Sequence, residues 1–486
     1  MASLRQQKEA FVSGHAGTTI GEVSAVAAAP VVLLLLWRLM QHPAASGAGL
    51  FHRAGPTAAG LALEFAALVL PQVAHLLGLA SPAALLGGAA AIAAALFATQ
   101  DSTDDALSAY RASLMLGTCI AILGVDFHAF PRRFAKAETF GTGLMDAGVG
   151  SFVAVSGLAH GLSAAARAAA APQQQQQQQC FPWGVQGGRA IALLALGLGR
   201  VLATGAADYQ NHASEYGIHW NFFLTLAALR LLGLLLPWAA GSGATAAAAG
   251  GAVLAAHQWG LSAGRLIEVV HSQGRGGGLL SANKEGLLSL PGYWALQLLG
   301  TAAGHAAYRV AAAAAAAAEA QQPGRRGAPP GNGASRSGIN NGLSVRVKVA
   351  QPQQRGPTLR LLAQLAAATG TLWLAYWAAA EAVQPVSRRA CNAAYVLWML
   401  ALNVQCVALF VAAELGLPGT MPHLMLAVSA AMLPFFLAAN LLTGALNLAV
   451  NALAATDAAA LLLVSGYMAL LCGGVVTASK WRQRSS

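Results

Sequence analysis

The sequence predicts an all-α polytopic membrane protein with about 13 transmembrane helices. Two observations on composition support this fold class: 56% of the 486 residues are hydrophobic, and only 9% are charged. Soluble domains carry roughly a quarter charged residues. The third observation is the length of the apolar runs, because a helix needs about 20 apolar residues to cross the hydrocarbon of a bilayer.

Apolar runs of this kind follow one another along the whole chain, separated by polar connections. Many of the runs are rich in Ala and Gly, which permit close helix packing in lipid. The predicted spans are 22–40, 57–79, 82–98, 111–127, 142–166, 186–206, 217–238, 243–263, 286–307, 358–382, 390–413, 424–450 and 456–478.

The predicted spans form a single transmembrane domain, residues 1–486, interrupted by two unusual connections. The low-complexity loop 167–185 contains a polyglutamine tract. The basic linker 311–356 begins with an alanine run, which could extend the preceding helix, and continues with Gly, Pro, Ser and Arg. Such a composition cannot bury enough apolar surface to order itself, so the linker is predicted to be disordered.

Charge sets the predicted orientation. The linker 311–356 and the C-terminal tail are both basic, so both are predicted to be cytosolic. An even number of spans separates them, which is consistent, and an odd total then leaves the N-terminus lumenal. Because the net charge of +11 lies mainly in such loops, it does not indicate a nucleic-acid partner. The oligomeric state is not predicted.

This orientation places four polar connections, 127–141, 207–216, 264–285 and 383–389, on the lumenal side. They contain no phosphate-binding loop, dinucleotide fingerprint, nucleophile triad or defensible metal-ligand spacing, so no metal is predicted. Their mixed charges predict a one-sided site that suits an anionic amphiphilic ligand. Structural pairing at helix entries is the competing explanation.

The first connection carries the strongest signal. Asp126 lies at the membrane end of a predicted span, and Lys136 follows ten residues later. Pro131 disfavours a helical conformation for its predecessor, so the segment is expected to turn back and bring acid and base together. Arg132 and Arg133 lie between them, on the side that the positive-inside rule disfavours.

Six segments, in order along nearly the whole chain, resemble the glucosaminyl-phosphatidylinositol inositol acyltransferases of GPI-anchor biosynthesis, also called the GPI-anchored wall transfer proteins. The longest and most specific elements are FPRRFAK, SEYGIHWNFF and NKEG. The segments are 8–23, 124–152, 208–223, 283–294, 386–398 and 439–453.

The resemblance implies an endoplasmic-reticulum membrane enzyme that transfers a fatty acyl group, usually palmitoyl, from acyl-CoA to the inositol 2-hydroxyl of glucosaminyl-phosphatidylinositol. It makes Asp126 and Lys136 the catalytic pair and requires no cofactor beyond acyl-CoA as co-substrate. Two positions depart from the family pattern, Gly205 and Asn211. The residues expected to bind substrate are Arg132, Arg133, Asp146, Arg200, His212, Glu215, His219, Asn221, Asn283, Lys284, Arg388 and Arg389.

The residues fit this chemistry. A thioester is already activated, so the enzyme must mainly orient and deprotonate one hydroxyl and stabilise an oxyanion. Asp126 would be the general base. Lys136 would compensate its charge, orient it or polarise the thioester. Arg132, Arg133, Arg388 and Arg389 are candidates for the phosphates, because a guanidinium can hold two phosphate oxygens.

Three alternatives remain open at this stage. A lipid transporter or scramblase would show the same one-sided charges. A non-catalytic component of GPI assembly would tolerate substitution of Asp126 and Lys136. A histidine-dependent membrane O-acyltransferase would use His128, His212 or His219 as the base.

Overall fold

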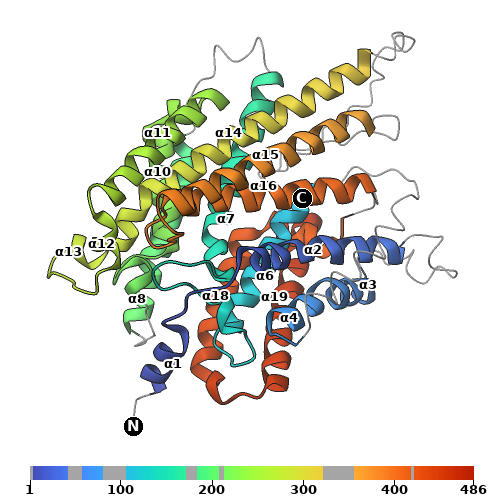
Figure 1. The fold of residues 1–486 in the computed structure, drawn as a ribbon. Helices are drawn as coiled ribbons and strands as arrows, with labels where there is room; N and C mark the ends of the chain where they lie inside the picture. Colours follow the sequence, from blue (N-terminus) through green and yellow to red (C-terminus); the bar gives the residue numbers. More distant parts are fainter. Residues whose placement is uncertain are drawn as a thin grey trace.

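The computed structural model describes residues 4–41, 57–79, 106–170, 183–206, 213–320, 355–416 and 421–485. Over these ranges the chain is built from helices, with no strand beyond an isolated bridge between Gly17 and Thr142 (Figure 1). The all-α prediction is therefore confirmed for the part of the chain that is described.

Every predicted span overlaps one or more helices, except 82–98, which lies outside the described residues. The helices are α2 (Ile20–Gln41), α3 (Ala58–Glu64) continued by a π-helical turn, η1 (Phe65–Val69), and α4 (Leu70–Leu76), α6 (Ala106–Gly124), α7 (Leu144–Ala170), α8 (Trp183–Ala206), α10 (Phe222–Leu235), α11 (Gly243–Ser262), α14 (Lys284–Ala320), α15 (Arg355–Ala382), α16 (Ala393–Gly416), α17 (His423–Ala430), α18 (Met432–Ala449) and α19 (Asp457–Ser485).

Short elements connect these helices and shape the loops between them. They are α1 (Leu4–Val12), η2 (Arg132–Phe134), α9 (Ala213–Tyr216), η3 (Pro237–Ala240), α12 (Leu266–His271), α13 (Leu279–Ala282) and η6 (Ala452–Ala454).

Seven of the described helices are long and apolar enough to cross a membrane, so the protein is a multi-pass membrane protein. The predicted count of about thirteen is not confirmed by this criterion. Helix α10 is apolar but shorter, and α8, α11, α14 and α15, which are rich in Ala, do not meet it. The seven segments are Ile20–Met40, Ala58–Leu76, Ala106–Gly124, Leu144–Ala169, Ala393–Gly416, Met432–Ala449 and Asp457–Arg482.

Several predicted boundaries are corrected by local structure. Helix α10 begins at Phe222 rather than 217, because the Asn221 side chain caps it by accepting hydrogen bonds from the backbone of Phe223 and Leu224. The expected span 424–450 is two helices, α17 and α18, separated at Ala431, whose φ of −130° and ψ of 36° are not helical.

The two predicted connections are shorter than the sequence indicated. Helix α14 continues through the alanine run to Ala320, and α15 starts at Arg355, so both ends of the expected linker 311–356 are helical. Likewise α7 reaches Ala170 and α8 starts at Trp183, inside the expected loop 167–185. The remainder of each connection lies outside the described residues.

Helices α7 and α14 pack backbone against backbone. A Cβ atom built on Gly157 of α7 would lie 2.2 Å from the carbonyl oxygen of Gln297, and one on Gly161 would lie 2.1 Å from that of Thr301. Gly300 and Gly304 make the same close approach from α14 to α7. Both helices therefore use the small-residue spacing that lets membrane helices approach closely, as the Gly content of the sequence led us to expect.

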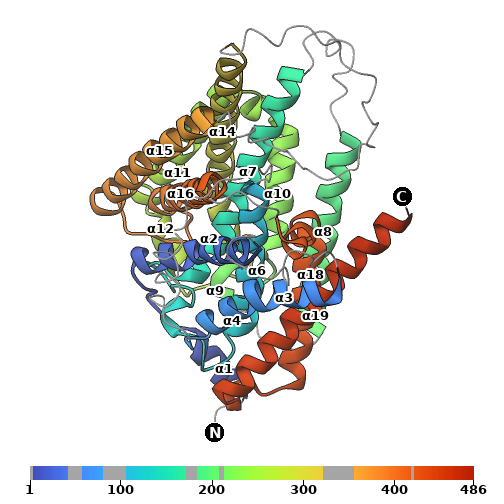
Figure 2. The same ribbon diagram turned by 90° about the vertical axis from the view of Figure 1, so that its right-hand side faces the viewer.

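Helices α14, α15 and α16 lie side by side in both views, whereas α6 lies at the centre, near α2, α18 and α19 (Figures 1 and 2). The Arg38 guanidinium of α2 donates a 2.6 Å hydrogen bond to Glu414 of α16, and both side chains are almost completely buried. Removing one partner of such a buried pair typically costs about 3–5 kcal/mol, because the other charge is left without compensation.

We expect Gly161→Ala to destabilise the protein by about 1–3 kcal/mol, because the added methyl group collides with the α14 backbone and forces the helices apart. Gly251→Ala in α11 is the matched control, since a Cβ there meets no atom within 4 Å. The measurement is the temperature at which the detergent-solubilised protein loses its monodisperse elution. Equal temperatures for the two variants would contradict the packing described for α7 and α14.

Candidate functional site

A cavity with a volume of about 980 Å³ opens among α6, α7, α8, α10 and α18. The loops that follow α6 (125–143), precede α10 (207–221) and precede α16 (383–392) contribute described residues to its wall. Its volume is near the upper end of the range for small-molecule pockets, about 300–1,000 Å³, which suits a large ligand.

Arg132 folds the loop after α6 back on itself. Its guanidinium donates hydrogen bonds of 2.8–3.0 Å to the carbonyl oxygens of Val125, Phe127 and Phe130. It also lies over the ring of Phe11 in α1, with its Cζ 4.1 Å from the ring centroid. Arg132 is not among the cavity-lining residues, and its contacts hold the loop in shape.

Asp126 and Lys136 both line the cavity, from opposite ends of this folded loop. The Asp126 carboxylate accepts a 2.7 Å hydrogen bond from Nδ2 of Asn447 in α18. Burial raises the pKa of Asp126 above its ordinary value, and the hydrogen bond from Asn447 and the charges of Lys8, Arg132 and Lys136 offset part of that rise.

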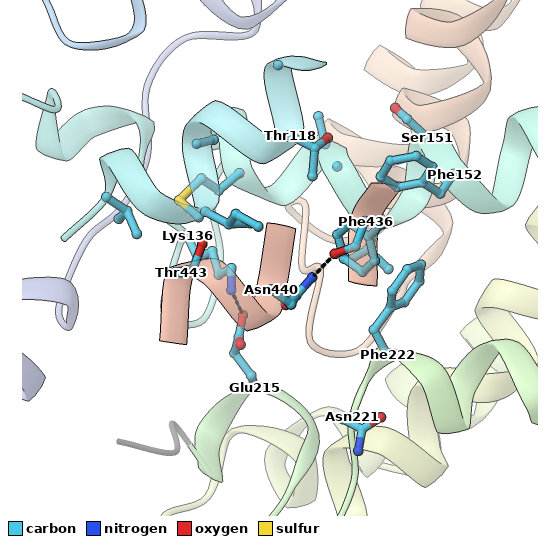
Figure 3. A pocket seen from close by; sticks show the side chains of 18 of the residues that line it. Thr118, Lys136, Ser151, Phe152, Glu215, Asn221, Phe222, Phe436, Asn440 and Thr443 are labelled. Atoms are coloured by element: carbon cyan, nitrogen blue, oxygen red, sulfur yellow. Dashed lines mark hydrogen bonds and ion pairs between the residues drawn. The ribbon is translucent and has the colours of Figure 1, made fainter. Parts of the chain in front are cut away.

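A series of ion pairs leads from Lys136 to the buried N-terminal end of α7. Lys136 pairs with Glu215 of α9 (Figure 3), and Oε1 of Glu215 lies 3.5 Å from Nη2 of Arg388. Nε of Arg388 donates a 2.8 Å hydrogen bond to Oδ1 of Asp146. Lys136, Glu215 and Arg388 line the cavity, and Asp146 lies behind them.

Asp146 is completely buried at the start of α7. Besides Arg388, its carboxylate accepts hydrogen bonds from the backbone N–H groups of Ala137 and Gly143, at 2.9 and 2.8 Å. All of these contacts are with protein groups, so Asp146 fixes the position of the loop that carries Lys136. Its role is to hold the site together.

Arg389 is also held by protein oxygen atoms, although part of it lines the cavity. Its Nη1 and Nη2 donate to the backbone carbonyls of Glu138 and Val270, both at 3.0 Å. Nη2 also lies 3.4 Å from Oε1 of the buried Glu285. These contacts join the loop before α16 to α12, to the start of α14 and to the loop after α6.

Four other predicted binding residues make local contacts with the protein. Asn221 lines the cavity, and the other three do not. Asn221 caps α10 and donates to the carbonyl of Gly197. Asn283 accepts a hydrogen bond from the backbone of His219. Lys284 donates to oxygen atoms of residues 272–274, and Arg133 pairs with a glutamate of α2 on the surface.

The remaining predicted polar residues differ in position. Arg200 of α8 is exposed and lines the cavity. His219 is exposed and does not line it, and His212 lies outside the described residues. His128 is exposed and packs edge-on against Phe11 rather than facing the cavity.

Two residues at or beside the cavity have weak sequence signals. His75 of α4, buried and part of the cavity wall, was not singled out, because a lone histidine in an apolar run has no motif. Asn447 is one of several asparagines in the C-terminal helices, and only the fold shows that it contacts Asp126. No group of three or more potential metal-ligating side chains occurs within the part of the chain that the structure describes.

The opposite part of the cavity is apolar. Phe152 of α7, Phe222 and Phe223 of α10 and Phe436 of α18 form a cluster with ring-centroid distances of 5.9–6.3 Å. Figure 3 shows Phe152, Phe222 and Phe436 on one side of the pocket and the Lys136–Glu215 pair on the other. The cavity therefore combines a charged end with an aromatic, apolar end, as an amphiphilic ligand requires.

Comparison with known proteins finds relatives that match nearly the whole chain. A family model described as GWT1 matches residues 4–478. The chain is 33% identical to GPI-anchored wall transfer protein 1 of Aspergillus oryzae over 97% of both chains, and 32% identical to that of Aspergillus fumigatus over 96% of both. It is 34% identical to an uncharacterised protein of Arabidopsis thaliana, over 74% of this chain and 70% of that one. The chain belongs to the GWT1 family.

Proposed function

We propose that this chain acts in GPI-anchor biosynthesis as an acyl-CoA-dependent O-acyltransferase. It transfers a fatty acyl group, usually palmitoyl, to the inositol 2-hydroxyl of glucosaminyl-phosphatidylinositol. The observation that carries the proposal is one cavity in which a half-buried carboxylate and a lysine lie at one end and a phenylalanine cluster lies at the other. The names of the relatives supply the pathway.

In this proposal Asp126 is the general base. The inositol oxygen attacks the thioester carbonyl carbon as its proton passes to the Asp126 carboxylate. The tetrahedral intermediate then collapses, the C–S bond breaks, and the CoA thiolate leaves and takes up a proton. Proton transfer by such a base typically contributes about 10²–10⁴-fold to the rate, and burial favours the base by raising its pKa.

Lys136 supplies positive charge beside the reacting groups. Its ammonium group is held by Glu215, so its position is defined before substrate binds. From there it can stabilise the oxyanion of the tetrahedral intermediate or the ionised form of Asp126, both of which are favoured by a preorganised cation. The proposal requires no cofactor and no metal ion.

The acyl chain is assigned to the apolar end of the cavity and the phosphates to the charged end. Lys136, Arg200 and Arg388 are the cavity-lining cations we assign to phosphate recognition. Arg132, Arg133 and Lys284, although predicted from sequence as binding residues, are assigned to holding the loops, because they do not line the cavity and their cationic groups contact protein oxygens.

We place the protein in the endoplasmic-reticulum membrane with a lumenal N-terminus and a cytosolic C-terminus. The support is the basic linker 311–356 and the basic end of α19, which contains Arg482 and Arg484. In this orientation the loops that carry Asp126 and Lys136 are lumenal.

Asp126→Asn and Lys136→Ala should each abolish acyl transfer while the protein still inserts and elutes as wild type. The expected loss for Asp126→Asn is about 10²–10⁴-fold, since the amide cannot accept the proton. His128→Ala, on the same loop but facing away from the cavity, is the matched control and should retain activity. Near-wild-type transfer by a folded Asp126→Asn protein would sink the assignment of the base, and loss in His128→Ala would favour a histidine mechanism.

The rate should fall at acidic pH with a midpoint above the ordinary aspartate value of 3.8, because burial raises the pKa of Asp126. The ionised form is the active one, so activity is full above the raised pKa and is lost as pH falls through it. The measurement is kcat/KM for transfer as a function of pH, with thermal stability followed in parallel. A midpoint at or below the ordinary value would contradict the proposal.

Tags placed within 321–354 and after Ser486 should both be accessible from the cytosol, and a tag before Met1 should be protected inside sealed microsomes. Positive-inside bias is the reason for this expectation. The measurement is protease protection before and after detergent. Glycosylation of an acceptor site introduced into 321–354 would reverse the proposed orientation.

A further inference from the structure

Asn447 contacts the proposed base from a remote part of the chain. It lies in the last turn of α18, 321 residues from Asp126, and its Nδ2 donates a 2.7 Å hydrogen bond to Oδ2 of Asp126. An asparagine in an apolar helix can also serve as a contact between helices. Here the contact is with a carboxylate that lines the cavity.

Asn447 is in contact with two other parts of the protein. Leu123, Phe127 and Val450 line a small space of about 10 Å³ together with Asn447, which is itself half-buried. On the other side, Nζ of Lys8 in α1 lies 3.4 Å from the backbone carbonyl oxygen of Asn447. The backbone of Asn447 is thus tied to α1, while its side-chain amide donates to the carboxylate of Asp126.

The direction of the hydrogen bond follows from charge. An ionised carboxylate can only accept hydrogen bonds, so the NH₂ group of Asn447 and not its carbonyl must face Asp126. The other groups that face Asp126 are Lys8 of α1, Arg132 of η2 and Lys136 of the loop, all cationic. Asn447 differs from them because it is uncharged and because its amide donates a hydrogen bond directly to Oδ2 of Asp126.

We propose that Asn447 is a positioning residue for the general base: it holds Oδ2 of Asp126, presents Oδ1 to the substrate hydroxyl and favours the ionised carboxylate. The inference rests on the proposed function, because it takes Asp126 to be the base. It extends that function to α18.

The test compares Asn447→Leu, of similar volume, with Asn451→Ala as the matched control. Asn451 is an exposed asparagine four residues later, and its side chain makes no capping hydrogen bond. Asn447→Ala serves as a second variant in case Leu disturbs folding. Full-length proteins in lipid nanodiscs are assayed for palmitoyl transfer from palmitoyl-CoA to glucosaminyl-phosphatidylinositol across a range of pH.

A second readout follows the protonation of Asp126 without catalysis. Infrared titration detects the carbonyl stretch of a protonated carboxyl group, and the band that is absent in Asp126→Asn is assigned to Asp126. This measurement separates the failure of the inference from the failure of the proposed function.

We expect Asn447→Leu to move both the acid limb of the rate and the infrared midpoint upward by about one pH unit, the effect of losing one hydrogen bond to a charged group. At one pH unit below the wild-type midpoint, Asn447→Leu should then be about tenfold less active than wild type, and raising the pH should restore its activity. Asn451→Ala should leave both midpoints unchanged.

The inference is overturned if both midpoints stay at their wild-type values, or if Asn447→Leu and Asn447→Ala lose activity equally at every pH. A shift of the infrared midpoint with an unchanged pH–rate profile has a different meaning. It would establish the contact between Asn447 and Asp126 and refute Asp126 as the base, so the proposed mechanism would fail.

Discussion

The site depends on the buried carboxylate of Asp146. It binds the Arg388 guanidinium and the backbone N–H groups of Ala137 and Gly143, and it is completely buried. Hydrogen bonds to a charged group contribute about 1.5–3 kcal/mol each, and an unpaired buried charge is costly. The loop after α6, the start of α7 and the loop before α16 are therefore held as one unit.

The position of this unit is set by the packing of α7 against α14. Asp146 stands in the first turn of α7, and α7 lies against α14 through Gly157, Gly161 and their counterparts. From Asp146 the interactions continue through Arg388 and Glu215 to Lys136. Close packing in the apolar part of the protein thus fixes charged side chains at one end of the cavity.

The helices and the most prominent charged loop could be predicted from sequence, because apolar length and intramembrane charge are local signals. The boundaries at Phe222 and Ala431 could not, since they depend on a cap and on a single non-helical residue. Pairings such as Asn447 with Asp126 or Arg388 with Asp146 join residues more than two hundred positions apart. From sequence, Arg132 and Lys284 have the same candidate role as Arg388, and only the fold shows that Arg388 lines the cavity and the other two do not.

The central claim is that this protein alone transfers an acyl group from a thioester to the inositol ring. The most direct measurement is incubation of the purified protein with palmitoyl-CoA and glucosaminyl-phosphatidylinositol, followed by mass spectrometry of the lipid. Our account predicts a product heavier by one palmitoyl group, attached at the inositol 2-hydroxyl, with release of one CoA thiol per product. Movement of the glycolipid between leaflets without any acylated product would contradict it.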